Sequence, residues 1–111
     1  MKIAISITGR ESSSTIDSRF GRALFFKIVE TESGEESVFD NSTSTEASHG
    51  AGMQTAQALA RQDVSAVVTG QVGPKAMNVL KAAKIRVFST NSTRVEDALE
   101  EFRSGNMQEL S

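Results

Sequence analysis

The stretch Val64-Ser65-Ala66-Val67-Val68-Thr69-Gly70-Gln71-Val72-Gly73-Pro74 decides the fold class that this sequence predicts. Residues 64–69 are an apolar run, as expected for a strand that is buried on both faces of a parallel sheet. The two glycines that follow make a turn, and Pro74 suits the first position of a helix, where a missing backbone N–H costs nothing. The order strand, turn, helix predicts a βαβ unit and therefore an α/β protein.

The C-terminal third continues this alternation. The helix that starts at Pro74 has an apolar face of Ala76, Val79, Leu80 and Ala83, and residues 85–89 form the next strand. Thr93-Arg94-Val95-Glu96 matches a capping box, so we expect a last helix to begin there. Gly105 is expected to end that helix, and the tail from Asn106 is expected to be frayed.

The N-terminal half contains three strand patterns before its first helix. The strands are expected at residues 2–7, 23–30 and 36–39, and the short turn between the last two implies an antiparallel hairpin. The Ser-rich run at residues 8–18 and the run at 40–46 are interpreted as loops. Apolar residues at helical spacing predict a helix from about His49 or Gly52 to Arg61.

This order of elements predicts a five-stranded mixed sheet. Strand 1 is apolar on both faces, so it is placed in the centre, which gives the order 3-2-1-4-5 with strand 2 antiparallel to the others. Strands 1, 3, 4 and 5 then end at the same edge. Ligands of open α/β sheets bind outside the carboxyl ends of the strands, so the loops at this edge are the expected binding site.

Composition limits the possible functions. A chain of 111 residues predicts one domain, and 12 basic against 14 acidic residues give no reason to expect binding to nucleic acid or to an anionic membrane. No cysteine is present, so a metal would arrive with most of its own ligands. The sequence has neither a signal-peptide pattern nor a membrane-spanning run, and we therefore expect a cytoplasmic protein.

The segment Ser48-His49-Gly50-Ala51-Gly52 is the expected centre of the site. It holds the only histidine and precedes a helix, whose unpaired N–H groups favour an anion. The predicted topology brings a second helix start, at Pro74, to the same edge. The basic residues expected around this edge are Arg10, Arg19, Arg22, His49 and Lys75.

Each candidate residue also has an ordinary structural interpretation. His49 could ligate a metal or be a solvated loop residue, and Met53 could offer a thioether or belong to the core. Arg22 could direct its guanidinium at an anion, or Phe20-Gly21-Arg22 could simply form a bend. Lys75 alone is most often a solvated surface charge.

Common hydrolase and nuclease patterns are missing from the sequence. It has no Ser-His-acid order, no HExxH element, no Gly-x-Ser-x-Gly element and too few carboxylates for a two-metal nuclease site. A small hydrolase or transferase remains a weaker hypothesis, with His49 as the only general base near neutral pH. The sequence shows no convincing pair of a general acid and a general base.

Five motifs in order resemble the dinitrogenase iron-molybdenum cofactor biosynthesis family, the small NifX-like domains that are also found behind the NifB radical enzyme. The resemblance covers nearly the whole chain. The motifs are Met1-Lys2-Ile3-Ala4-Ile5, Arg19-Phe20-Gly21-Arg22-Ala23, His49-Gly50-Ala51-Gly52, Gly70-Gln71-Val72-Gly73-Pro74-Lys75-Ala76 and the helix from Val95.

This resemblance implies that residues 1–111 form a single NifX-like domain with a ribonuclease-H-like, three-layer α/β/α fold. It also implies a protein that is not an enzyme and that binds or carries an iron-sulfur or iron-molybdenum cluster or its precursor, with other metallocluster biosynthesis proteins as partners. His49 would be the metal contact. The residues expected to surround the cluster are Arg19, Phe20, Gly21, Arg22, Gly50, Gly52, Gly70 and Gly73. The alternative is a binding module for a small anionic metabolite or nucleotide at the same loops.

Overall fold

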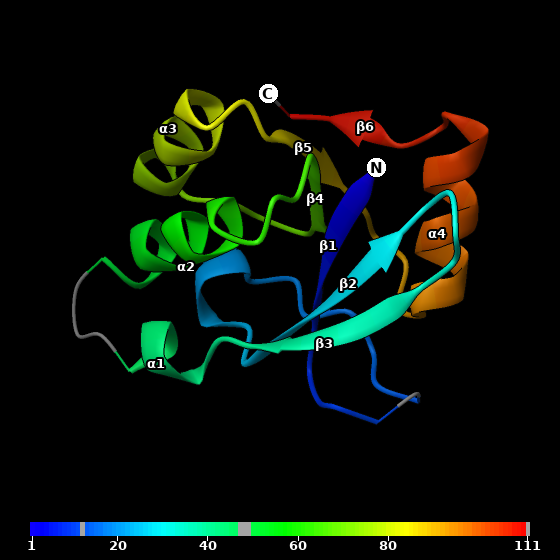
Figure 1. The fold of residues 1–111 in the computed structure, drawn as a ribbon, viewed down its shortest axis with the longest axis horizontal. Helices are drawn as coiled ribbons and strands as arrows, with labels where there is room; N and C mark the ends of the chain where they lie inside the picture. The colour runs from blue at the N-terminus through cyan, green and yellow to red at the C-terminus, as the bar shows by residue number, and fades with distance from the viewer. Residues whose placement is uncertain (12, 47–49, 111) are drawn as a thin grey trace.

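A single mixed β-sheet with helices on both faces forms the protein (Figure 1). The structure is a computed structural model, and it describes residues 1–11, 13–46 and 50–110. The strands of the described chain are β1 (Lys2–Ile7), β2 (Phe25–Glu30), β3 (Glu36–Asp40), β4 (Ala66–Thr69), β5 (Arg86–Ser89) and β6 (Gln108–Glu109). The helices are η1 (Phe20–Arg22, a 3-10 turn), α1 (Ser42–Thr45), α2 (Ala51–Ala60), α3 (Pro74–Ala82) and α4 (Val95–Ser104).

The strand order is β3-β2-β1-β4-β5-β6, which confirms the predicted order of the first five strands. Strand β1 pairs antiparallel with β2, where Ile5 faces Lys27, and parallel with β4, where Ile5 faces Val68. Strands β4 and β5 are also parallel. The carboxyl ends of β1, β3, β4 and β5 therefore meet at one edge of the sheet.

The prediction of five strands is wrong, because a sixth strand extends the sheet beyond β5. β6 pairs antiparallel with β5, with Glu109 opposite Phe88, and it lies in the tail that was expected to be frayed. The Arg86 guanidinium holds it through hydrogen bonds of 3.0 and 2.8 Å to the two carboxylate oxygens of Glu109. A strand of two polar residues has no apolar alternation from which it could be predicted.

The alternating side chains of β1 separate two hydrophobic cores. Ala4 faces the helices α2 and α3, where Leu59 and Leu80 are completely buried. Ile3, Ile5 and Ile7 face α4 on the other side of the sheet. Figure 1 shows these three layers, with α2 and α3 on one face and α4 on the other. The predicted central position of β1 therefore holds.

The start of the last helix differs from the prediction. Thr93 and Glu96 do not form the expected capping box, since the N-cap is Arg94 and no side chain caps this helix end. Arg94 instead makes a β-bridge with Thr15, and the Thr93 carbonyl accepts a 2.9 Å hydrogen bond from the Ile16 N–H. Residues 93 and 94 are thus paired with the loop after β1, and the helix begins one residue later than the capping box predicted.

Two smaller points concern the other helices. The predicted loop at residues 40–46 contains the short helix α1, whose Ser and Thr residues give little helical signal. Gly105 ends α4 with a φ of 77°, as predicted for a glycine cap. Within the described ranges, no helix has the length and apolar character that crossing a bilayer requires.

Candidate functional site

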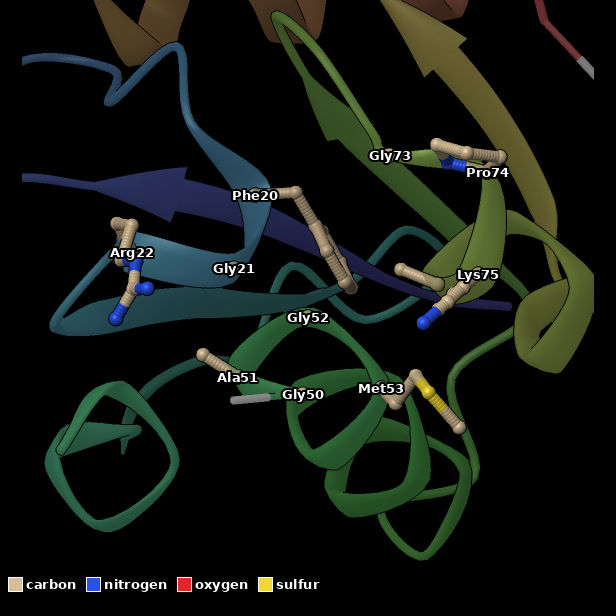
Figure 2. A pocket seen from close by; sticks show the side chains of 11 residues that line it. Phe20, Gly21, Arg22, Gly50, Ala51, Gly52, Met53, Gly73, Pro74 and Lys75 are labelled. Carbon is tan, nitrogen blue, oxygen red and sulfur yellow. The ribbon is translucent and has the colours of Figure 1, made fainter. Parts of the chain in front are cut away.

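A cleft of about 470 Å³ lies where η1 meets the first turns of α2 and α3 (Figure 2). All three segments follow the carboxyl ends of strands, so the cleft lies at the edge where the sequence predicts a binding site. It is lined by Phe20, Gly21, Arg22, Gly50, Ala51, Gly52, Met53, Gly73, Pro74, Lys75 and Ala76.

Small residues allow the three segments to approach closely. A Cβ atom on Gly21 would lie only 2.8 Å from the Gly52 Cα atom and 2.9 Å from the Gly52 nitrogen. A Cβ atom on Gly52 would in turn lie 3.2 Å from the Cβ atom of Ala76. The backbones of η1 and α2 are therefore in direct contact, and glycine at position 21 is a steric requirement of the cleft.

Phe20 anchors η1 to the core beneath the cleft. Its side chain is buried and meets the Phe26 ring edge to face, with 5.6 Å between the ring centroids. The Phe20 N–H donates to the Gln71 carbonyl over 3.2 Å, and the Gln71 N–H donates to the Ser18 carbonyl over 2.7 Å. These bonds join the loop after β1 to the loop after β4 in one wall.

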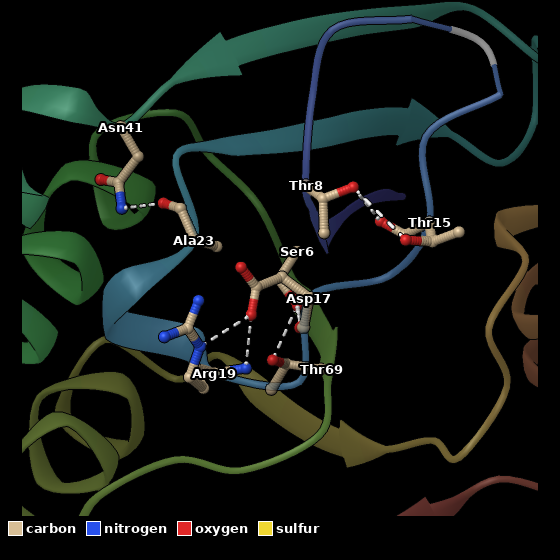
Figure 3. A network of polar contacts seen from close by, with 8 residues as sticks. All are labelled: Ser6, Thr8, Thr15, Asp17, Arg19, Ala23, Asn41 and Thr69. Atoms are coloured by element: carbon tan, nitrogen blue, oxygen red, sulfur yellow. Dashed lines mark hydrogen bonds and ion pairs between the residues drawn. The ribbon is translucent and has the colours of Figure 1, made fainter.

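Buried polar groups fix the same wall to the sheet (Figure 3). The Ser6 hydroxyl donates to the Asp17 carbonyl over 2.6 Å and shares a 2.7 Å hydrogen bond with the Thr69 hydroxyl. The Asp17 carboxylate accepts hydrogen bonds from the backbone N–H of Arg19 at 2.9 Å and from its Nε at 3.3 Å. Strands β1 and β4 thus hold the residues that lead into η1.

Asn41 fixes the other end of η1. Its amide nitrogen donates to the Ala23 carbonyl and to the Thr55 hydroxyl of α2, both over 2.9 Å. Asn41 is buried, and so is Thr55. The position of η1 relative to α2 is therefore set by the fold in the absence of any ligand.

The electrostatic character of the cleft favours a negative ligand. Neither α2 nor α3 has a side-chain hydrogen bond at its N-cap, and neither has an acidic residue in its first turn. Lys75 and Arg22 add two positive charges, and the Arg22 Nη1 also donates to the Thr45 carbonyl over 3.1 Å. The described lining residues include no carboxylate. Two helix ends and two cations therefore line a space to which the described residues contribute no negative side chain.

Six of the residues predicted from the sequence line this cleft. They are Phe20, Gly21, Arg22, Gly50, Gly52 and Gly73. His49, the predicted metal contact, lies outside the described residues. Gly70 does not line the cleft, since it is packed in the wall where a Cβ atom would lie 2.7 Å from the Ser18 carbonyl oxygen.

Two of the basic residues that were expected around this edge, Arg19 and Arg10, do not line the cleft. The Arg19 guanidinium pairs with Asp17 and does not line the cleft. Arg10 pairs with Asp40 over 2.9 Å and lies 4.7 Å from the centroid of the Phe25 ring. The Ser42 backbone N–H, more than Arg10, holds the pKa of Asp40 below its ordinary value. Both arginines thus have partners inside the protein.

The structure adds residues to those that were expected to surround the ligand. Lys75 and Met53 line the cleft, together with Ala51, Pro74 and Ala76. The signal was present in the sequence, because these residues are the first turns of the two helices that were expected to point at the ligand. Among the described residues, no group of three or more His, Cys, Asp or Glu side chains could hold a bare metal ion.

The fold defines a class of small α/β proteins in which a cleft at the carboxyl edge of the sheet is lined by the first turns of two helices. A family model described as dinitrogenase iron-molybdenum cofactor matches residues 1–105. The chain belongs to this family, which confirms the resemblance seen in its motifs.

Three relatives extend this result. The apo form of the orange protein from Desulfovibrio gigas has a TM-score of 0.94 and 35% identity, covering 99% of this chain and 92% of that one. A Thermotoga protein solved by NMR and named as a NifB candidate has a TM-score of 0.84 and 35% identity, covering 98% and 92%. An uncharacterized protein of Methanocaldococcus jannaschii is 32% identical and covers 99% of this chain and 92% of its own length.

Proposed function

We propose that this protein binds and carries a preformed iron-sulfur or iron-molybdenum cluster, or a precursor of one, in the cleft between η1, α2 and α3. The observation that carries the proposal is the pair of helix N-termini, without side-chain caps or acidic first turns, that face one cleft with Arg22 and Lys75. Membership of the iron-molybdenum cofactor family supports a cluster as the anion. The role is that of a carrier and not of an enzyme.

The donor set of the cleft fits a cluster that brings its own ligands. Backbone N–H groups and cationic side chains stabilise sulfide and oxide ligands on the outside of a cluster, but they cannot ligate a bare cation. Carboxylates, which would favour a bare cation, are missing from the described lining. Few direct ligands imply weak and reversible binding, which suits transfer between metallocluster biosynthesis proteins better than storage.

His49 is the residue of this chain that we propose as the direct metal contact. Imidazole is a suitable ligand for iron, and His49 directly precedes Gly50, the N-cap of α2 at the cleft. The ribonuclease-H-like class, which the family resemblance implies, belongs to the same proposal. The order β3-β2-β1-β4-β5 with an antiparallel β2 supports it.

Anaerobic titration with a purified iron-sulfur cluster tests the function. We expect the visible absorption of the cluster to elute with the protein in size exclusion, and His49→Ala and Arg22→Gln to weaken this co-elution. Arg61→Gln is the matched control, because Arg61 is an exposed arginine that caps the far end of α2.

The competing hypothesis makes a different prediction in the same experiment. A binding module for a small anionic metabolite or nucleotide would show a higher melting temperature with phosphate or a nucleotide, and no co-elution with the cluster. That result would reject the cluster carrier and leave the anion-binding cleft intact. Unchanged cluster binding by His49→Ala would remove only the role of the histidine.

A further inference from the structure

Met53 is a hydrophobic side chain that takes no part in either core. It lies in the first turn of α2, is half-buried and lines the cleft, and it belongs to neither hydrophobic cluster of the described residues. Met77 on α3 behaves differently, since it packs against the core beneath α2 and α3. Figure 2 shows the Met53 and Lys75 side chains extending from α2 and α3 on the side of the cleft away from Arg22.

The chemistry of the other lining residues leaves one property of the ligand unspecified. Helix N-termini, Arg22 and Lys75 recognise negative charge, and they attract a sulfide-rich cluster and a hard oxoanion alike. A thioether is different, because it is a soft donor that binds thiophilic metals and has little affinity for an oxoanion. Among the described lining residues Met53 is the only one with a sulfur atom.

We propose that the Met53 Sδ atom coordinates a metal atom of the cargo and so makes the cleft selective for a metal-sulfur cluster over an oxoanion of similar charge. This inference rests on the proposed carrier function. The Sδ lone pair forms one coordinate bond, a labile external ligand leaves the metal, and no oxidation state changes. Met53 then selects a cargo that contains a thiophilic metal, while Arg22 and Lys75 select a cargo with negative charge.

Two variants of equal size test this role. Leucine has nearly the volume of methionine and no sulfur, so Met53→Leu removes the donor and retains the apolar contact. Met77→Leu is the matched control in the core. We expect Met53→Leu to weaken the binding of a synthetic cubane iron-sulfur cluster with labile thiolate ligands by about tenfold, and to leave the binding of inorganic phosphate unchanged.

A second readout observes the bond itself. In selenomethionine-labelled protein loaded with the cluster, selenium-edge X-ray absorption should show an iron neighbour, and this signal should disappear in labelled Met53→Leu but remain in labelled Met77→Leu. Thermal melting of the unloaded variants checks that both remain folded.

The outcomes separate this inference from the function on which it rests. Equal cluster affinity in Met53→Leu, or no iron neighbour of selenium in a loaded wild-type protein, overturns the role of Met53 and leaves the carrier function standing. A wild-type protein that binds phosphate but no cluster overturns both.

Discussion

The helix starts on the two faces of the sheet are built differently. Helix α4 carries Glu96 and Asp97 in its own first turn, so the positive end of its dipole meets carboxylates of the same helix. Helices α2 and α3 begin without acidic residues, and their first turns line the cleft. The helix end on one face therefore has carboxylates of its own, whereas the two helix ends on the other face have none, as the proposed anion site requires.

This difference shows that a helix N-terminus indicates an anion site only when the charges of its first turn are also considered. Counting only the N-termini of the three longer helices, α2, α3 and α4, would give three equal candidates for an anion site. The first-turn sequences distinguish these candidates. In Val95-Glu96-Asp97 two carboxylates neutralise the positive end of the helix dipole. Neither Ala51-Gly52-Met53 nor Pro74-Lys75-Ala76 contains a carboxylate, so the positive ends of α2 and α3 are not neutralised in this way. Close packing at Gly21 brings η1 against the start of α2, and Gly52 packs that start against Ala76 of α3.

The largest effect is expected from Gly21→Ala. The new Cβ atom would meet the Gly52 backbone at 2.8 Å, so η1 and α2 must separate. We expect a loss of about 1–3 kcal/mol in the free energy of unfolding, as for other overpacked sites, together with loss of ligand binding. Urea unfolding and the cluster titration measure the two effects. Gly73→Ala is the control, since a Cβ atom there meets nothing within 4 Å, and equal stability losses in the two variants would contradict this account of the packing.

A charge reversal at Lys75 makes the start of α3 resemble that of α4. In Lys75→Glu the new carboxylate interacts favourably with the helix dipole, so stability should stay equal or rise by about 0.3–1 kcal/mol. Binding of an anionic ligand should weaken by about tenfold or more, which corresponds to about 1.4 kcal/mol. Lys81→Glu, in the last turn of the same helix, changes the net charge equally. If both variants bound equally well, a general effect of net charge would replace the local one.

A smaller effect is expected on the pH dependence of stability, through the carboxylate of Glu101 in α4. The hydroxyls of Ser92 and Thr90 donate to Glu101 over 2.6 and 2.9 Å and hold its pKa below the ordinary value of 4.5. Because the folded pKa is the lower one, the stabilisation is complete above pH 4.5 and is lost as the pH falls through the folded pKa. Glu101→Gln should therefore lose less stability than the wild type between pH 5 and roughly pH 3.

Urea unfolding at a series of pH values measures this slope. Glu100→Gln, an exposed neighbour that changes the net charge equally, is the control. Identical slopes in wild type and Glu101→Gln would show that these two hydroxyls do not couple to folding.

Strand order was accessible from the sequence because it depends on long apolar patterns. The alternation around Ile3, Ile5 and Ile7 and the run at residues 64–69 place β1 and β4 in the centre, and short connections fix their neighbours. Elements without such patterns were missed. β6 is held by one edge pairing and the Arg86–Glu109 ion pair, neither of which has a periodic signal.

Part of the site could be predicted from the sequence for the same reason. Topology brings the glycine turns together, so Gly21, Gly52 and Gly73 were expected at one edge and lie at one cleft. Side-chain partners could not be predicted in this way. A sequence does not show that Arg19 forms an ion pair with Asp17, or that Arg10 forms one with Asp40. The capping box failed similarly, since Thr93 and Arg94 pair with a loop nearly 80 residues earlier in the chain.

The anchoring of Phe20 has a kinetic consequence for exchange of the proposed cargo. Its ring packs in the core and its N–H is bound to Gln71, so the wall of the cleft is already in place before a ligand arrives. A preformed wall needs little ordering on association, and release then requires only the rupture of contacts to the cargo. The release rate of the proposed cargo is then set by its own contacts in the cleft, with no rearrangement of the wall.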